Sequence, residues 1–160
     1  LKVLVGYPSP TEEFVIVDRM TQAIDTINTV ITTDQLAELQ SEADQVYVDP
    51  ALKHYAVSLV TATRNPAAAG QDKLAKYMSY GASPRASINM VLAGRALAFL
   101  RGRTYALPED VRDVAADVLR HRIVLSYEAL ADAVSPDDLI TALMDAVPLP
   151  EVALQEPASE

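Results

Sequence analysis

The stretch Gly81-Ala82-Ser83-Pro84-Arg85-Ala86 decides the fold of this chain, and an apolar helix that runs to about Leu100 follows it. Ser83 is predicted to be the N-cap of this helix, because its hydroxyl can accept a hydrogen bond from a first-turn amide, and Pro84 suits the first helical position. Gly81 allows the backbone to turn sharply before the cap. The stretch therefore predicts a helix start that holds Arg85 in a fixed place.

An arginine is an unusual residue in the first turn of a helix. The helix dipole favours acids there and disfavours a base by about 0.3–1 kcal/mol. A bound anion would reverse that preference, because a helix N-terminus together with a planar guanidinium forms a phosphate site. The alternative is a surface arginine that pairs with a nearby carboxylate.

Capping motifs and apolar periodicity predict further helices on both sides of this one. The first begins at Ser9-Pro10-Thr11-Glu12 and extends to about Asn28, and its apolar side chains include Phe14, Val17, Met20 and Ile24. The other expected elements are a short helix from Thr32, an extended run at 46–48, a helix from Asp49-Pro50 to about Arg64, a loop at 66–71, a short helix or ordered segment at 72–80, a helix that starts at Glu109-Asp110, an extended segment at 120–125 and a last helix from Ser135-Pro136.

The apolar pattern also predicts which side chains form the core. In the helix after Pro50 the expected face is Leu52, Tyr55, Ala56, Leu59, Val60 and Ala62-Thr63. In the central helix it is Ile88, Val91, Leu92, Ala96 and Phe99, and Gly102 is expected to end that helix in a left-handed conformation.

Leu1-Lys2-Val3-Leu4-Val5 alternates as a strand does, and it ends at Gly6 and Pro8. A single strand of this length is not stable without a neighbour. Two interpretations remain open: the strand pairs with Val46-Tyr47-Val48, or it is the last strand of a sheet whose other strands lie upstream.

Composition limits the classes of function. The chain has 160 residues, no cysteine, two histidines far apart and a net charge of −9. It therefore lacks a disulfide framework and a thiolate metal site, no metal site is expected, and a general nucleic-acid binder is disfavoured. No apolar run reaches the roughly 20 residues of a membrane span, so we expect a cytoplasmic protein that binds neither membrane nor nucleic acid.

Charge is unevenly distributed along the chain. Residues 85–122 contain seven arginines and four acids, a local charge of +3, whereas the remaining residues carry six bases and eighteen acids, a charge of −12. Such a basic segment suits an anionic ligand or an acidic partner. The alternative is pairing with neighbouring acids, which we favour for Arg95 and Arg112.

The motifs of a complete nucleotide hydrolase are not found. None of the five glycines begins a Gly-x-x-x-x-Gly-Lys-Ser/Thr loop, and no apolar strand ends in an acidic pair for magnesium. Phosphoryl transfer needs a phosphate cradle and a metal in addition to a cationic clamp. Catalysis by these residues alone is therefore not expected.

The ordered set of motifs resembles the lid domain of the MoxR family of AAA+ ATPases. The similarity includes Val5-Gly6-Tyr7-Pro8-Ser9, Gly81-Ala82-Ser83-Pro84-Arg85-Ala86, Leu100-Arg101-Gly102-Arg103-Thr104-Tyr105, Pro108-Glu109-Asp110-Val111, Leu119-Arg120-His121-Arg122 and Val124-Leu125-Ser126-Tyr127-Glu128. The resemblance implies an all-α fold, a small helical bundle preceded by one residual β-strand of an α/β core. It divides the chain into the last core strand and hinge (1–8), the helical lid (9–147) and an acidic, proline-containing tail (148–160) that we expect to be disordered.

The resemblance also implies functional residues. Arg85 would be the sensor 2 arginine that contacts the terminal phosphate of ATP, with Ser83 beside it. Tyr7 and Pro8 would contact the adenine or form a plain hinge. Arg120 or Arg122 could reach a neighbouring subunit.

By the same resemblance, the parent protein would be an ATPase in which the nucleotide-binding core holds ATP and magnesium. It would assemble as a ring, expected to be a hexamer, and remodel or mature client proteins, among them proteins with von Willebrand factor A domains. Whether Arg85 serves its own subunit's ATP or a neighbour's is left open. The rival hypotheses are a helical adaptor that binds only protein, and the lid of an ATPase of the magnesium-chelatase or replicative-helicase type.

Overall fold

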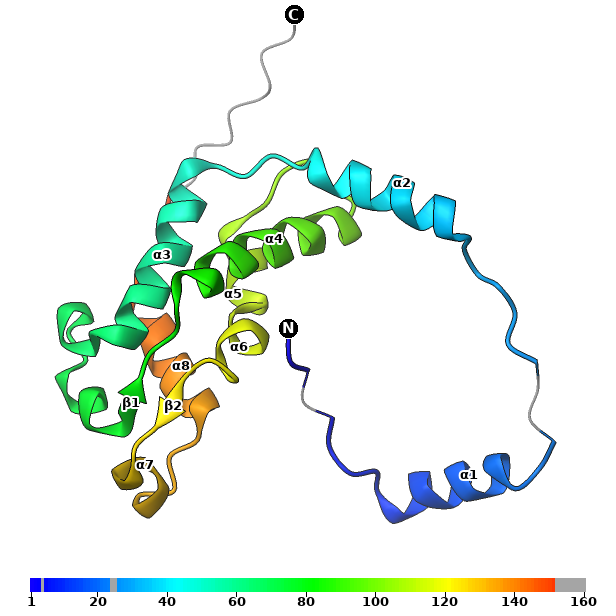
Figure 1. The fold of residues 1–160 in the computed structure, drawn as a ribbon, viewed down its shortest axis with the longest axis horizontal. Coiled ribbons are helices and arrows are strands. Elements are labelled where there is room, and N and C mark those ends of the chain that lie inside the picture. Colours follow the sequence, from blue (N-terminus) through cyan, green and yellow to red (C-terminus); the bar gives the residue numbers. More distant parts are fainter. Residues whose placement is uncertain (4, 24–25, 152–160) are drawn as a thin grey trace, which may run out of the picture.

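The computed structural model describes residues 1–3, 5–23 and 26–151, and they form a mainly helical structure with one small sheet (Figure 1). The expected all-α class is confirmed. The elements in order are α1 (Pro10–Met20), α2 (Thr33–Asp44), α3 (Pro50–Arg64), the 3-10 turns η1 (Pro66–Ala69) and η2 (Asp72–Tyr77), β1 (Met78–Tyr80), α4 (Pro84–Leu100), α5 (Pro108–Asp113), α6 (Ala115–Leu119), β2 (Val124–Leu125), α7 (Tyr127–Ala131) and α8 (Pro136–Ala146). None of the helices described is long and apolar enough to cross a membrane.

Several helix starts follow from short-range capping, as the sequence predicts. The side chains of Ser9, Thr32 and Ser135 each accept a hydrogen bond from the backbone amide of the residue three positions later. The side chain of that later residue in turn accepts a hydrogen bond from the backbone amide of the capping residue. Asp49 caps α3 through the Ala51 amide at 2.7 Å. These contacts satisfy amides that would otherwise lack a partner.

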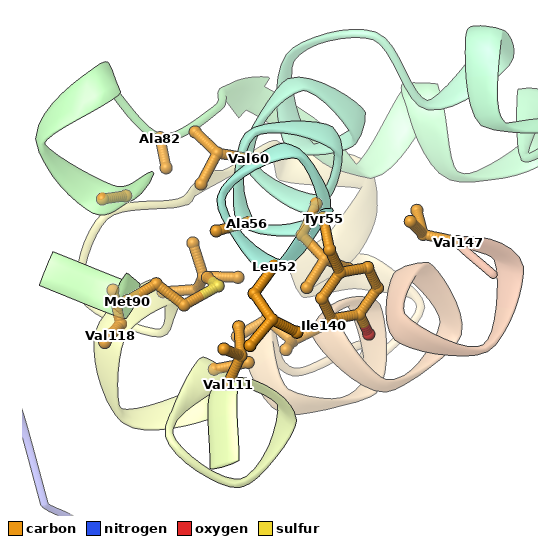
Figure 2. Packing of buried hydrophobic residues seen from close by; sticks show 14 of the residues in the cluster. Leu52, Tyr55, Ala56, Val60, Ala82, Met90, Val111, Val118, Ile140 and Val147 are labelled. Atoms are coloured by element: carbon orange, nitrogen blue, oxygen red, sulfur yellow. The ribbon is translucent and has the colours of Figure 1, made fainter. Parts of the chain in front are cut away.

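Helix α3 lies at the centre of the core (Figure 2). Its predicted face is confirmed, since Leu52, Tyr55, Ala56, Leu59, Val60, Ala62 and Thr63 are all buried. This face packs against α4, α5 and α8, and Met90, Val111 and Ile140 are among the residues that fill the space between them. Burial of a leucine or valine side chain contributes about 1.5–3 kcal/mol to the free energy of folding. Because α3 buries several such side chains, it contributes strongly to the stability of the bundle.

Helix α4 faces the core through small residues, and the predicted face is wrong in part. The buried residues are Ala86, Met90, Gly94 and Ala98, which recur every four positions. Ile88 and Leu92 are 59% and 46% exposed, and Ala96 is also exposed, whereas Val91 and Phe99 pack partly against the core. The reason at Gly94 is close packing against α5: a Cβ there would lie 3.1 Å from the Cγ2 of Val111, so a side chain at this position would be crowded.

The small sheet joins two segments that are distant in the sequence. β1 pairs with β2 in an antiparallel arrangement, so of the expected extended segment 120–125 only Val124–Leu125 form a strand, whereas residues 120–122 form the turn that ends α6. Tyr47 forms a separate bridge with Tyr105, in which the Tyr47 amide donates to Thr104 and the Ala106 amide donates to Tyr47. Tyr47 therefore pairs with Tyr105, and the interpretation in which residues 46–48 pair with the N-terminal stretch is wrong.

The N-terminal part of the chain buries little. Residues 1–3 and 5 are not in a strand, and the Lys2 amide donates to the Asp117 carbonyl at 2.9 Å. Helix α1 ends at Met20 rather than near Asn28, and α1 and α2 bury none of their residues. In Figure 1, α1 lies apart from the bundle. Three parts of these predictions lie outside the described residues: Leu4 of the expected strand, Ile24 of the expected first helix, and residues 152–160 of the expected tail.

Candidate functional site

The turn before α4 is held against the end of α3. Thr63 is buried, and its hydroxyl accepts a hydrogen bond from the Ala82 amide at 2.9 Å while donating to the Val60 carbonyl at 2.6 Å. A Cβ on Gly81 would lie 2.3 Å from the Thr63 carbonyl oxygen, a distance at which no side chain fits. The predicted need for glycine therefore has a specific cause, the close approach of the turn to α3.

Ser83 occupies the N-cap position of α4, but its hydroxyl does not cap the helix. The Ala86 amide donates to the Ser83 carbonyl at 2.8 Å instead. This tighter first turn satisfies the amide that the hydroxyl was predicted to bond. The exposed Ser83 hydroxyl thus stays available beside Arg85.

Arg85 differs from the other arginines of the basic segment. It is exposed, and no hydrogen bond or ion pair to it is found among residues 1–3, 5–23 and 26–151. Within the same part of the chain the other six all contact protein acceptors: Arg95 with Asp44, Arg101 with Asp110 and Asp113, Arg103 with Asp110, Arg112 with Asp145, Arg120 with Asp117 and Asp137, and Arg122 with the Val118 carbonyl. Pairing of Arg95 and Arg112 with acids is as expected, whereas the alternative of a carboxylate partner for Arg85 is not observed among these residues.

Asp110 forms a buried ionic cluster that the sequence did not predict, because first-turn acids usually lie at the surface. Its carboxylate accepts from Arg101 at 2.8 Å, from Arg103 at 2.5 and 2.7 Å and from the Leu107 amide at 2.8 Å. Burial opposes the ionisation of Asp110, but hydrogen bonds from Arg103, Leu107 and Arg101 outweigh it and hold its pKa below the usual value. The cluster fixes the connection between α4 and α5 and is structural in character.

Arg120 and Arg122 lie at the end of α6 and in the turn after it. Arg120 bonds to Asp137 at 3.0 Å, to Asp117, and to the Lys2 carbonyl at 2.8 Å. Arg122, in the turn, bonds to the Val118 carbonyl of α6. Both guanidinium groups have acceptors within the chain, and their predicted role at a subunit interface stays a prediction.

The structure brings Ser83 and Arg85 together, and it leaves Tyr7 and Pro8 on the exposed connection that leads to α1. Within the described residues, no three histidine or acidic side chains gather in a way that could hold a metal ion. Sequence reasoning missed Thr63 as part of the site. The sequence does contain a signal for it, a polar residue on an otherwise apolar helix face.

Comparisons with known proteins identify the fold. Residues 71–143 match the model of the AAA lid domain. The protein named Chaperone MoxR1 from Mycobacterium tuberculosis is 44% identical over 151 residues, which are 94% of this chain and 40% of that protein. Protein MoxR from Paracoccus denitrificans is 43% identical over 110 residues, or 65% of this chain and 32% of that protein.

A solved structure agrees. A crystal structure of a protein described as a candidate ATPase, from Cytophaga hutchinsonii, superposes with a TM-score of 0.84 at 34% identity and covers 92% of this chain and 45% of that one. The chain spans about 40% of the MoxR1 protein and between 32% and 45% of the other proteins that it matches. The sequence similarity and the helical architecture together show that this chain carries an AAA lid domain and belongs to the MoxR family of AAA+ ATPases.

Proposed function

We propose that this lid domain supplies Arg85 to ATP held by a nucleotide-binding core, and that it couples the state of the nucleotide to movement between lid and core. Arg85 would contact the terminal phosphate and stabilise the negative charge that grows there during hydrolysis. Ser83 and the first turn of α4 would lie beside the phosphate. Tyr7 and Pro8 would lie in the crossover between core and lid and contact the adenine.

The observation that carries this proposal is the absence of a protein partner for Arg85 among the described residues, in a segment where six other arginines have one. A guanidinium in the first turn of a helix is unfavourable unless an anion compensates it. A helix N-terminus with an uncommitted arginine binds phosphate well, because the amides and the planar cation both donate to its oxygens.

The exposed apolar face of α1 fits a core that packs against the lid. Phe14, Val17 and Met20 are three residues apart and 71%, 53% and 60% exposed. A contiguous apolar surface of this kind usually marks an interface. In the proposed protein, residues 1–8 form the last core strand and the hinge, and α1 packs against the core of the same polypeptide.

The similarity to a protein named as a chaperone supports a role in remodelling client proteins. In this proposal the complete ATPase forms a homo-oligomeric ring, which we expect to be a hexamer. Proteins with von Willebrand factor A domains are the clients whose binding should be tested first. Light scattering of the complete polypeptide with and without ATP measures the ring size.

The central test is the substitution Arg85→Ala in the polypeptide that joins this lid to its core. Loss of one preorganised donor to a charged transition state typically costs about 10²–10³ in rate, so ATP turnover should fall by about a hundredfold. Circular dichroism should show an unchanged fold, because Arg85 has no bond in the described part of the lid.

Arg95→Ala is the matched control. Arg95 lies on the same helix but pairs with Asp44, and the pair is partly exposed. Its removal should leave ATP turnover within about twofold, since exposed ion pairs contribute little. If Arg85→Ala also left turnover unchanged, we would prefer the rival hypothesis of an adaptor that binds only protein. The exposed face of α1 would suit that adaptor equally well.

A further inference from the structure

We propose that Thr63 is a positioning residue for Arg85: its buried hydroxyl fixes the start of α4 against the end of α3 and thereby sets where the guanidinium can reach. The inference rests on the proposed function of Arg85. Thr63 itself would touch no nucleotide, since it is 1% exposed.

The hydroxyl of Thr63 is bonded on both sides. It donates to the Val60 carbonyl within α3 at 2.6 Å, which sets the direction of its lone pairs, and it accepts from the Ala82 amide at 2.9 Å. Ala82 is itself fully buried. The bond therefore joins two elements that are 19 residues apart in sequence at a point where no water can replace it.

The backbone on either side leaves the turn no freedom to shift toward α3. A Cβ on Gly81 would lie 2.3 Å from the Thr63 carbonyl oxygen and 2.7 Å from the Cγ of Arg64, so the two backbones are already in contact. Pro84 restricts the backbone on the other side, because its ring fixes φ. Between these two points the turn has one polar anchor in the described structure, the Thr63 hydroxyl.

Arg85 depends on this anchor because its side chain has no hydrogen bond or ion pair in the described structure, so only the backbone fixes where it starts. The guanidinium therefore takes its place from the backbone of the first turn of α4. A displacement of about 1 Å at a positioning group can cost about 10²-fold in rate. A small shift of the turn would reach the phosphate contact without unfolding the bundle.

The experiment compares Thr63→Val with Thr63→Ser in the complete polypeptide, each alone and combined with Arg85→Ala. Valine keeps the shape of threonine and removes the hydroxyl, whereas serine keeps the hydroxyl. We expect Thr63→Val to lower kcat for ATP hydrolysis by about tenfold or more with a smaller change in KM, and Thr63→Ser to restore kcat to within about threefold.

The double variant separates positioning from folding. If Thr63 acts through Arg85, Thr63→Val should cause no further loss of turnover in the Arg85→Ala background, when rates are corrected for the folded fraction measured by circular dichroism. An equal loss in both backgrounds, or a kcat of Thr63→Val equal to the unsubstituted value, would overturn the inference while leaving the role of Arg85 intact. Unchanged turnover in Arg85→Ala alone would instead overturn the proposed function, and this inference with it.

Discussion

Asp110 offers the sharpest test of stability at the level of a single residue. Its carboxylate is fully buried and neutralises Arg101 and Arg103, which are themselves partly exposed. Removing one member of a buried ion pair typically costs 3–5 kcal/mol. Because the two arginines can turn toward water, we expect Asp110→Asn to lower the free energy of unfolding by about 3 kcal/mol in urea titrations.

Asp113→Asn is the control for this prediction. Asp113 lies on the same helix and pairs with Arg101 at 2.6 Å, but its side chain is 49% exposed. An exposed pair contributes at most about 1 kcal/mol. A similar loss in both variants would contradict a special role for burial at Asp110.

The same carboxylate predicts how stability depends on pH. The pKa of Asp110 is lower in the folded chain than its usual value, so its contribution is complete above the unfolded pKa of about 3.9 and is lost as pH falls through the folded pKa. Below about pH 4, unfolding midpoints of the unsubstituted chain should therefore fall more steeply with pH than those of Asp110→Asn. Parallel pH profiles would show that Asp110 does not titrate in this way.

At the level of elements, α3 should dominate the stability of the bundle. Leu59 is 1% exposed and Val57, two residues earlier on the same helix, is 50% exposed. Truncation of a buried leucine costs about 2–5 kcal/mol, whereas surface substitutions usually stay within about 0.5 kcal/mol. Thermal unfolding should show a much larger loss of stability for Leu59→Ala than for Val57→Ala. Comparable losses of stability in the two variants would contradict the central position of α3 in the core.

The sequence predicted elements best where the determining contacts are local. The caps at Ser9, Thr32, Asp49 and Ser135 involve residues two or three positions apart, and all of them are confirmed. The buried face of α4 was partly wrong because it depends on the distance to α5, which no local pattern contains. The face of α3 could be predicted because its neighbours accept large side chains on a broad apolar surface.

The same distinction applies to the candidate site. Short motifs brought Gly81, Ser83 and Arg85 to attention, and the close approach of Gly81 to α3 gives that expectation a physical basis. The polar residue Thr63 on an apolar helix face was a signal in the sequence, but its bond to the Ala82 amide and the lack of a partner for Arg85 depend on which groups the fold brings near. The proposed role in ATP hydrolysis stays a prediction until turnover is measured.

At the level of the whole molecule, the exposed face of α1 predicts that the stability of this helix depends on the rest of the polypeptide. In the chain of 160 residues, Phe14→Ser should leave thermal unfolding unchanged, because the side chain is 71% exposed and α1 buries no residue. In the complete polypeptide, where we propose that the same face packs against the core, the substitution should cost about 3 kcal/mol, the scale for losing a buried aromatic ring. Leu130→Ser in α7, with 67% exposure, is the matched control and should behave alike in both proteins. Equal behaviour of Phe14→Ser in the two proteins would mean that the core does not cover α1, and the division of the chain at residues 1–8 and 9–147 would have to be drawn elsewhere.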